Sequence, residues 1–225
     1  MRIGTFNLAG RWSPLHHDFL LTLDCDVWLL TEVSERTTLD GFDLHLGEGV
    51  MAPKRRWAAV AATGSMAPLV DPHPASAMIQ QDGIRFCSSI LPWRGCGSRE
   101  PWGAGTHAEK TLETLRVLET ALPTAGLVWG GDWNHALTGA ETAGSKAGRN
   151  ALLATIHKLN LEVPTREQPH RIGDITSIDH IAVPKGVAAG AERVVAEADG
   201  KRLSDHDAYV VTTGPAIVTP METSC

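Results

Sequence analysis

Carboxylates, an amide and a histidine recur in this sequence at points where apolar runs end. They are Asn7, Glu32, Asp132, Asn134, Asp179, Asp205 and His206. Carboxylate oxygens are the ligands that Mg²⁺ prefers, and a histidine held by a carboxylate can stabilise negative charge on a phosphate. Each residue alone is more often a helix cap or turn former. The chemistry therefore depends on whether the fold brings them together.

The run VWGGDWNHAL places two of these residues directly after a buried-strand pattern. Asp132 and Asn134 are two apart, so both side chains emerge on one face if the strand continues to Asn134, and Trp133 points to the other face. Gly130 and Gly131 are expected to let a ligand or ion approach the backbone closely. The pair suits a carboxylate that holds a water and an amide that orients it.

The elements that must position these residues are mixed strands and helices. Helices are expected from Ser13 and Pro14, from a capping box of Thr106 with Glu109, and over 150–161. Strands are expected in MRIGTFNLA, DVWLLTEV, GLVWGGD, SIDHIAV and DAYVVTT, with a run of antiparallel strands between 42 and 91. Because helices are too few to alternate with every strand, an α+β sandwich is favoured over a doubly wound sheet.

Length and charge limit the organisation and the partners. The chain has 225 residues, 43% of them hydrophobic and 20% charged, with a net charge of −6. We expect a single domain over 1–213 and a flexible tail over 214–225. The acidic balance disfavours tight non-specific binding to duplex DNA. A basic strip at 54–56 can touch a phosphate backbone but is more often a solvated turn.

Cysteine usage and hydropathy indicate a compartment. The four cysteines form no CxxC pair, and no charged-then-apolar leader precedes the first strand. No apolar run approaches the roughly 18 residues that span a bilayer. We therefore expect a cytoplasmic protein that does not insert into membranes, and no feature indicates an obligate protein partner.

Five motifs in order, an asparagine at the end of the first strand, then LLTEV, GDWN, SIDH and SDHDA, resemble the endonuclease/exonuclease/phosphatase superfamily. The resemblance extends from Asn7 to about Val211. It implies the DNase I-like fold, a four-layered α/β sandwich of two mixed, mainly antiparallel β-sheets flanked by helices. It also implies a metal-dependent site that cleaves phosphoesters.

The resemblance assigns a role to each motif residue. Glu32 matches the principal Mg²⁺ ligand, Mn²⁺ being possible, with Asp205 and Asn7 as neighbours of the ion. Asp132 matches the residue that activates the attacking water, and Asn134 matches its amide partner. His206 matches the catalytic histidine, and Asp179 matches the carboxylate that pairs with it.

Other histidines have simpler interpretations. His180 follows Asp179 on the same strand and should point the opposite way, into packing. His135 is either a loop residue near the site or simply exposed. His16 and His17 begin a helix and are read as surface residues.

The sequence departs from the family on a central strand. Many members carry a histidine or tyrosine there, whereas the corresponding run CSSILPWRG offers Ser89 or Ile90. Neither is a strong general acid. Leaving-group protonation then falls to His206, to a water on the metal or to a group from the following loop, or else the activity is weakened or altered.

That loop, PWRGCGSREPWGAGTH, is too irregular for a strand or helix and is expected to border the cleft. Trp93 and Trp102 can stack on a planar substrate group, or cover the edge of the core. Arg94 and Arg99 can contact phosphates. His107 can substitute for the missing acid.

The sequence thus favours a Mg²⁺-dependent phosphodiesterase, in particular a nuclease on single-stranded, nicked or short nucleic acid. Two alternatives stay open. One is a hydrolase of a small soluble phosphoester, which the acidic charge favours. The other is a catalytically silent binding domain, which the missing strand histidine or tyrosine favours.

Overall fold

The computed structural model describes residues 1–214, so the tail expected over 214–225 lies, apart from Gly214, outside the described residues. Within them the helices are α1 (Pro14–Thr22), α2 (His107–Ala121), α3 (Lys146–Lys158) and the short 3-10 helix η1 (Pro164–Glu167). None of these described helices has the length and apolar character needed to cross a membrane.

The first sheet contains seven strands among the described residues. In spatial order they are β12 (Ala188–Val194), β15 (Ala208–Thr213), β1 (Arg2–Asn7), β2 (Val27–Ser34), β5 (Arg55–Thr63) and β3 (Phe42–Leu46), with β4 (Val50–Ala52) also pairing with β5. β1 and β2 are parallel, whereas the other pairs are antiparallel. The sheet is therefore mixed and mainly antiparallel.

The second sheet contains six strands of the described part and has the same character. In order they are β10 (Leu161–Glu162), β11 (Asp179–Pro184), β9 (Leu127–Asp132), β8 (Ile84–Ser89), β7 (Ser76–Gln81) and β6 (Ala67–Pro68). Only β8 and β9 pair in parallel here. A separate small hairpin joins β13 (Glu197–Ala198) to β14 (Lys201–Arg202). The strands expected between 42 and 91 are thus divided between the two sheets.

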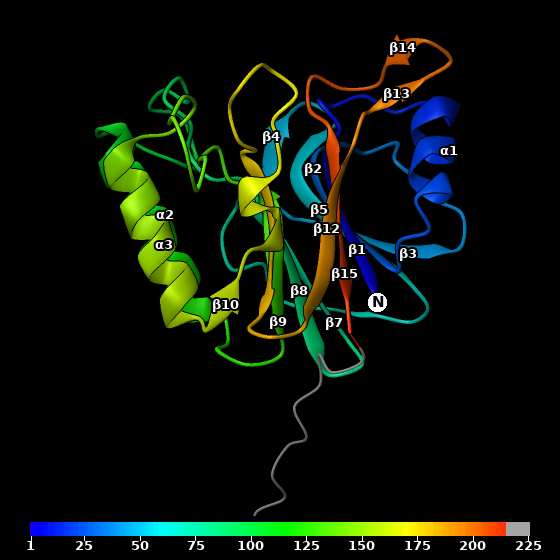
Figure 1. Cartoon of the computed structure of the whole chain (residues 1–225), viewed down its shortest axis with the longest axis horizontal. Helices are drawn as coiled ribbons and strands as arrows, with labels where there is room; N and C mark the ends of the chain where they lie inside the picture. Colours follow the sequence, from blue (N-terminus) through cyan, green and yellow to red (C-terminus); the bar gives the residue numbers. More distant parts are fainter. Residues whose placement is uncertain (215–225) are drawn as a thin grey trace, which may run out of the picture.

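The elements form four layers (Figure 1). The two sheets face each other over a core that includes Leu29 and Phe86. α1 covers the outer face of the first sheet and contributes Phe19 to a second core. α2 and α3 lie side by side over the second sheet, where Leu118 packs in one cluster with Trp129. Full burial of each such side chain contributes about 1.5–3 kcal/mol, so all three interfaces stabilise the sandwich.

The helix starts follow their capping residues. Thr106 and Glu109 form the expected capping box of α2. The third helix, expected over 150–161, spans Lys146–Lys158 instead, because the side chain of Ser145 accepts a hydrogen bond from the backbone N–H of Gly148 and caps α3. Gly148 packs closely against the ring of His135. A Cβ on Gly148 would lie 2.3 Å from Nε2 of His135.

Candidate active site

The polar residues singled out in the sequence converge where the carboxyl ends of β1, β2 and β9 meet the start of β11. There a cleft of about 320 Å³ opens at the edge of the two sheets. Its lining residues are Glu32, Met51, Ile90, Trp93, Asp132, Asn134, Asp205 and His206. Five of these eight were predicted as catalytic or metal-binding residues, so one site gathers segments that are far apart in the chain.

Strand pairing determines which side chains become neighbours. The parallel register of β1 with β2 sets Asn7 opposite Thr31, beside Glu32. The antiparallel register of β9 with β11 sets Asp132 opposite Asp179. Nδ2 of Asn7 donates to Oδ2 of Asp132 at 3.0 Å and to Oε1 of Glu32 at 3.3 Å. Because Asp132 is on the second sheet, this amide joins the two sheets at the site.

Glu32 reaches the cleft through a change of backbone conformation. Leu29 faces the core between the sheets, and Leu30 faces the core under α1. Strict alternation would return Val33 to the core between the sheets, yet it packs under α1. The switch occurs at Glu32, whose φ is +50°, an unfavourable value for a residue with a Cβ. The strained residue is the one that carries the candidate metal ligand.

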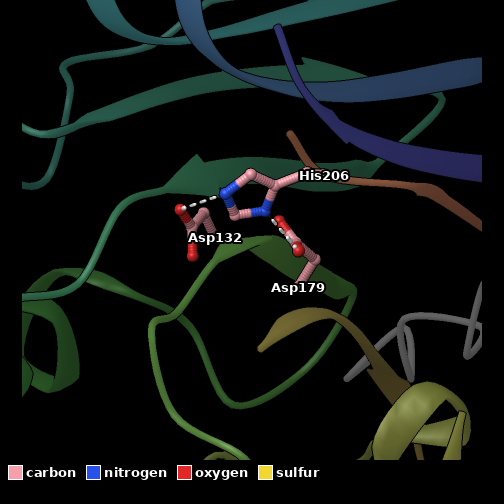
Figure 2. A group of neighbouring side chains, drawn as sticks. All are labelled: Asp132, Asp179 and His206. Carbon is pink, nitrogen blue, oxygen red and sulfur yellow. Dashed lines mark hydrogen bonds and ion pairs between the residues drawn. The ribbon is translucent and has the colours of Figure 1, made fainter. Parts of the chain in front are cut away.

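Asp179 and His206 form a close pair (Figure 2). Nδ1 of His206 donates to Oδ2 of Asp179 at 2.7 Å. Nε2 of His206 lies 3.9 Å from Oδ2 of Asp132. Burial opposes protonation, but the negative charges of Asp179 and Asp132 outweigh it and raise the pKa of His206 to about 10. His206 is therefore an imidazolium at neutral pH, and its Nε2–H is directed at the cleft side of Asp132.

Asp132 lies on the opposite side of this histidine and is almost fully buried. Burial, and then the charge of Asp179, raise its pKa to about 7, against the opposing effect of His206. Its Oδ1 accepts a 3.1 Å bond from the backbone N–H of Asn134. A carboxylate with a pKa near neutrality can take up and release a proton at working pH.

The amide and the glycines of the GGDWN run behave differently from the sequence-based expectation. β9 ends at Asp132, and Asn134 has a φ of +53°, so the pleat does not carry both side chains onto one face. Asn134 still lines the cleft, held by a 3.0 Å bond from its Nδ2 to the carbonyl of Leu91. Gly130 and Gly131 admit neighbouring backbone and not a ligand. A Cβ there would lie 2.5 Å from the carbonyl oxygen of His180 and 2.3 Å from that of Ser89.

The loop that carries Asp205 and His206 is anchored from both sides. Oγ of Ser204 donates to the carbonyl of Asn7 at 2.6 Å and accepts from the N–H of His206 at 3.1 Å. The buried carboxylate of Asp207 binds Arg193 and Arg202, each at 2.6 Å. Although burial opposes it, bonds from Ala196 and the two arginines lower the pKa of Asp207. These contacts fix the backbone on which His206 projects.

The donor set of the cleft fits a hard divalent cation. Glu32 and Asp205 present carboxylates that are accessible from the cleft, and such oxygens are what Mg²⁺ takes. Asn7 directs its Oδ1 to the backbone N–H of Ala9 at 2.8 Å and its N–H groups to the carboxylates, so it fits an orienting role better than that of a ligand. Asp132, Asp179 and His206 also offer atoms within 4.8 Å of one another. Protonated His206, however, has no free lone pair for a metal.

One contact of Glu32 was missed by the sequence analysis. Nη1 of Arg55 lies 3.3 Å from Oε2 of Glu32, and its guanidinium packs over Gly10. Arg55 belongs to the basic strip that was read as a solvated turn. It is half-buried instead, because the antiparallel pairing of β2 with β5 brings it opposite Ser34, next to the site. Only strand pairing reveals this contact, since no local spacing marks it.

Three histidines outside the cleft are buried and hold parts of the fold together through hydrogen bonds. His180 is fully buried and its Nε2 bonds the carbonyl of His135 at 2.9 Å, which agrees with the expected packing role. Of the two alternatives for His135, the exposed one is wrong, since the residue is fully buried with Nδ1 on the carbonyl of Trp133. The surface interpretation of His16 is also wrong. Its ring bonds Ser13 and the carbonyl of Leu203, both within 2.9 Å, and so ties α1 to the loop of His206.

The residues of the loop 92–107 differ in whether they reach the cleft. Trp93 lines the cleft, and Arg99 is exposed. Trp102 is 7% exposed and packs in a cluster with Ile90. His107 is held by Ser145 and by the carbonyl of Pro92, at 3.0 and 2.9 Å. It is therefore directed away from the cleft and is a poor substitute for the missing acid.

Arg94 is likewise engaged with the protein itself. Its Nε donates to the carbonyl of Gly144 and its backbone N–H to the carbonyl of Ala143. The loop is thereby pinned to the segment that precedes α3. These bonds fix the direction of the guanidinium of Arg94, which is still exposed.

Comparison with known proteins finds similar folds but no similar sequence. No protein-family model matches the sequence, and no curated protein matches it. Among solved structures, an AP endonuclease from Archaeoglobus fulgidus is 16% identical with a TM-score of 0.70, over 95% of this chain and 99% of that one. The 3′ phosphatase NExo from Neisseria, bound to a product DNA hairpin, is 16% identical with a TM-score of 0.69 over the same shares.

A third similar structure is an endonuclease/exonuclease/phosphatase family protein from Leptotrichia buccalis, 13% identical, with a TM-score of 0.61 over 95% of this chain and 99% of that one. The chain has the DNase I-like fold. The four-layered sandwich predicted from the motifs is thus confirmed. In this DNase I-like sandwich the motif residues occupy one edge, where the two sheets meet.

Proposed function

We propose that this protein is a metal-dependent phosphodiesterase that hydrolyses nucleic-acid phosphodiester bonds by in-line attack of water. The observation that carries the proposal is the pairing of a protonated histidine, His206, with a near-neutral carboxylate, Asp132, across one cleft beside Glu32 and Asp205. A binding domain without catalysis has no need for two buried neighbouring groups whose pKa values are both raised, to about 7 for Asp132 and about 10 for His206.

Asp132 and Asn134 act on the attacking water in this proposal. Asp132, with its pKa near 7, accepts the proton of the water as its oxygen attacks phosphorus. Asn134 has its side chain fixed by Leu91 and its backbone by Asp132, so it offers a rigid polar contact at the same point. Asn7 holds Asp132 and Glu32 in place from below.

His206 acts on the phosphate. Its Nε2–H donates a charge-assisted bond to a non-bridging oxygen, where negative charge grows in the transition state. Asp179 keeps the ring protonated and oriented. Glu32 and Asp205 would hold Mg²⁺ or Mn²⁺, and the bound ion would neutralise phosphate charge and polarise the phosphorus–oxygen bond. Ile90 lines the cleft where many members of the family carry a histidine or tyrosine. His206 is then the one protonated side chain among the residues that line the cleft, so it also donates the proton that the leaving-group oxygen takes up.

Two observations support the proposed substrate class, the similar structures and the net charge. The similar structures include an AP endonuclease and a phosphatase with bound DNA hairpin. A net charge of −6 argues against broad contact with duplex DNA. Single-stranded, nicked or short nucleic acid is the proposed substrate. The same charge keeps a small phosphoester as the second candidate.

A phosphoester panel tests the proposal. Oligonucleotides, nucleotides, sugar phosphates and bis(p-nitrophenyl) phosphate are offered with Mg²⁺, with Mn²⁺ and with EDTA. Cleavage of oligonucleotides that stops in EDTA supports the proposal. Turnover of small phosphoesters alone moves the assignment to the second candidate. No turnover with either cation, at normal thermal stability, contradicts hydrolase function.

A matched variant keeps this test specific. Glu32→Gln preserves side-chain size but removes the anionic ligand, and Glu48→Gln changes an exposed glutamate outside the cleft. Glu32→Gln should raise the Mg²⁺ concentration needed for half-maximal activity, whereas Glu48→Gln should not. If the two variants need the same Mg²⁺ concentration, Glu32 is not a metal ligand.

A further inference from the structure

A second recess adjoins the cleft and shares two of its walls. It measures about 430 Å³, and Met51 and Trp93 line both spaces. Its other walls include Trp57 from β5 and the loop residues Cys96 and Trp102. The recess therefore lies beside the place proposed for the scissile phosphate, within reach of a group attached to that phosphate.

Three tryptophan rings form planar apolar walls of this recess, whereas Ser98, Arg99 and Glu100 add polar and charged groups to its lining. The ring centroids of Trp57 and Trp102 lie 5.6 Å apart, with the rings at 70°. Trp93 lies 6.4 Å from Trp57 at 52°. The ring of His73 also stacks on Trp102 at 5.4 Å and 17°, so Trp102 is supported on one of its faces. Rings fixed in this way offer flat contact area without a large ordering cost on binding.

The lining residues also include charged side chains and a buried donor. Nε1 of Trp102 has no hydrogen-bond partner within residues 1–214, but its burial keeps it out of reach of a ligand in this conformation. Arg99 lies at the exposed rim of the recess, where a phosphate next to a bound group would pass.

We propose that this recess binds one unpaired nucleobase of the substrate, next to the phosphate that is cleaved. The proposal rests on the proposed function and specifies its substrate as single-stranded nucleic acid. Aromatic walls bind a base by stacking, which every base permits. A base inside a duplex is stacked on its neighbours and cannot enter a recess unless it leaves the helix. Ser98, Cys96 and Trp57 thereby join Trp93, Arg99 and Trp102 as substrate-facing positions.

Binding measured without turnover tests the recess. Quenching of tryptophan fluorescence is followed in EDTA as the wild-type protein is titrated with a short oligothymidylate, and with an abasic strand of equal length. The abasic strand retains the phosphates but has no bases. We expect the oligothymidylate to bind at least about fivefold more tightly, at the low end of the range for stacking of one base. Equal affinities would overturn the proposal.

Two variants locate the effect. Ser98→Leu fills the recess from an exposed wall position, and Ser65→Leu makes the same change on an exposed residue outside it. The preference for bases should disappear in Ser98→Leu and persist in Ser65→Leu, at unchanged thermal stability. A preference that survives in Ser98→Leu would also overturn the proposal. If Ser98→Leu unfolds, the wild-type comparison still decides.

This design separates the recess from the catalytic proposal. The titrations use no metal and require no hydrolysis, so a base preference with no turnover would leave the recess assigned and the hydrolase assignment contradicted. If the protein cleaves single strands and abasic strands at equal rates and binds them with equal affinities, the hydrolase assignment stands and the recess proposal is overturned.

Discussion

Oδ2 of Asp179 accepts a 2.7 Å hydrogen bond from Nδ1 of His206, and the other carboxylate oxygen, Oδ1, is buried with no partner among residues 1–214. The charge of Asp179 is therefore compensated through His206 alone at this position. The histidine in turn depends on Asp179 for its protonation. The two residues form one electrostatic unit that spans β11 and the loop before β15.

This unit predicts a particular dependence of stability on pH. The pKa of His206 is raised from 6.5 to about 10, so the native state holds this proton more tightly than the unfolded state. The resulting stabilisation is fully present below about pH 6.5 and is lost as the pH rises toward 10. In Asp179→Asn the melting temperature should fall less between pH 6.5 and 10. Differential scanning fluorimetry in EDTA measures this, and parallel curves for the two proteins would contradict the pairing.

Asp132→Asn should abolish most of the turnover and change the pH dependence in another range. General-base catalysis contributes about 10²–10⁴-fold, so kcat on bis(p-nitrophenyl) phosphate should fall by that factor. The raised pKa of Asp132 means that its ionisation costs stability as the pH rises from 3.8 to about 7. The melting temperature of the variant relative to wild type should therefore increase between pH 4 and 8. Asp43→Asn, an exposed change on β3, is the control and should alter neither quantity.

The buried ion pairs of Asp207 should matter more than an exposed one. Asp207→Asn leaves Arg193 and Arg202 without their carboxylate and should lower the free energy of unfolding by about 3 kcal/mol. Glu192→Gln breaks the exposed pair with Arg2 and should cost no more than about 1 kcal/mol. Urea denaturation compares the two variants. Equal losses would show that Asp207 does not anchor the loop of His206.

Gly131 should be irreplaceable for a reason of packing. Its φ is +122° and an added Cβ would lie 2.3 Å from the carbonyl of Ser89, so Gly131→Ala should destabilise the protein by about 2 kcal/mol or more. Gly190, on β12, has open space around its missing Cβ, and Gly190→Ala should be nearly neutral. Thermal denaturation of both variants measures the difference. A stable Gly131→Ala would mean that β8 and β9 can separate at this point.

Local patterns in the sequence predicted some strand ends and missed others. Asn7 and Asp132 end β1 and β9 as expected, because apolar runs of strand length end where the chain leaves the core. Glu32 was expected where an apolar run ends, yet β2 continues to Ser34, and Asp179, expected inside its strand, begins β11. The order of the motifs then sufficed to identify the fold. Residue roles at the site stay predictions, because the geometry shows which side chains meet but not what they catalyse.

Features that depend on pairing between distant strands were not predictable. Arg55 reaches Glu32 only through the register of β2 with β5. The role of Gly130 and Gly131 depends on which backbone lies across from them, and the sequence alone suggested a ligand. The buried state of His16 follows from a contact with Leu203, far along the chain, and that of His135 from the nearby segment of Gly144 and Gly148. Apart from His135, each of these errors concerns a long-range contact.

The bond from Asn7 to Asp132 has a consequence for how the protein loses its site. Its two ends belong to different sheets, so neither half of the sandwich contains the cleft by itself. A partly folded form with only the first sheet intact would keep Glu32 and Asp205 but would lose Asp132 and Asp179, which the second sheet carries. Turnover, and not cation affinity, would then report on the docking of the two halves, and it would vanish during denaturation no later than the near-ultraviolet signal of the buried tryptophans.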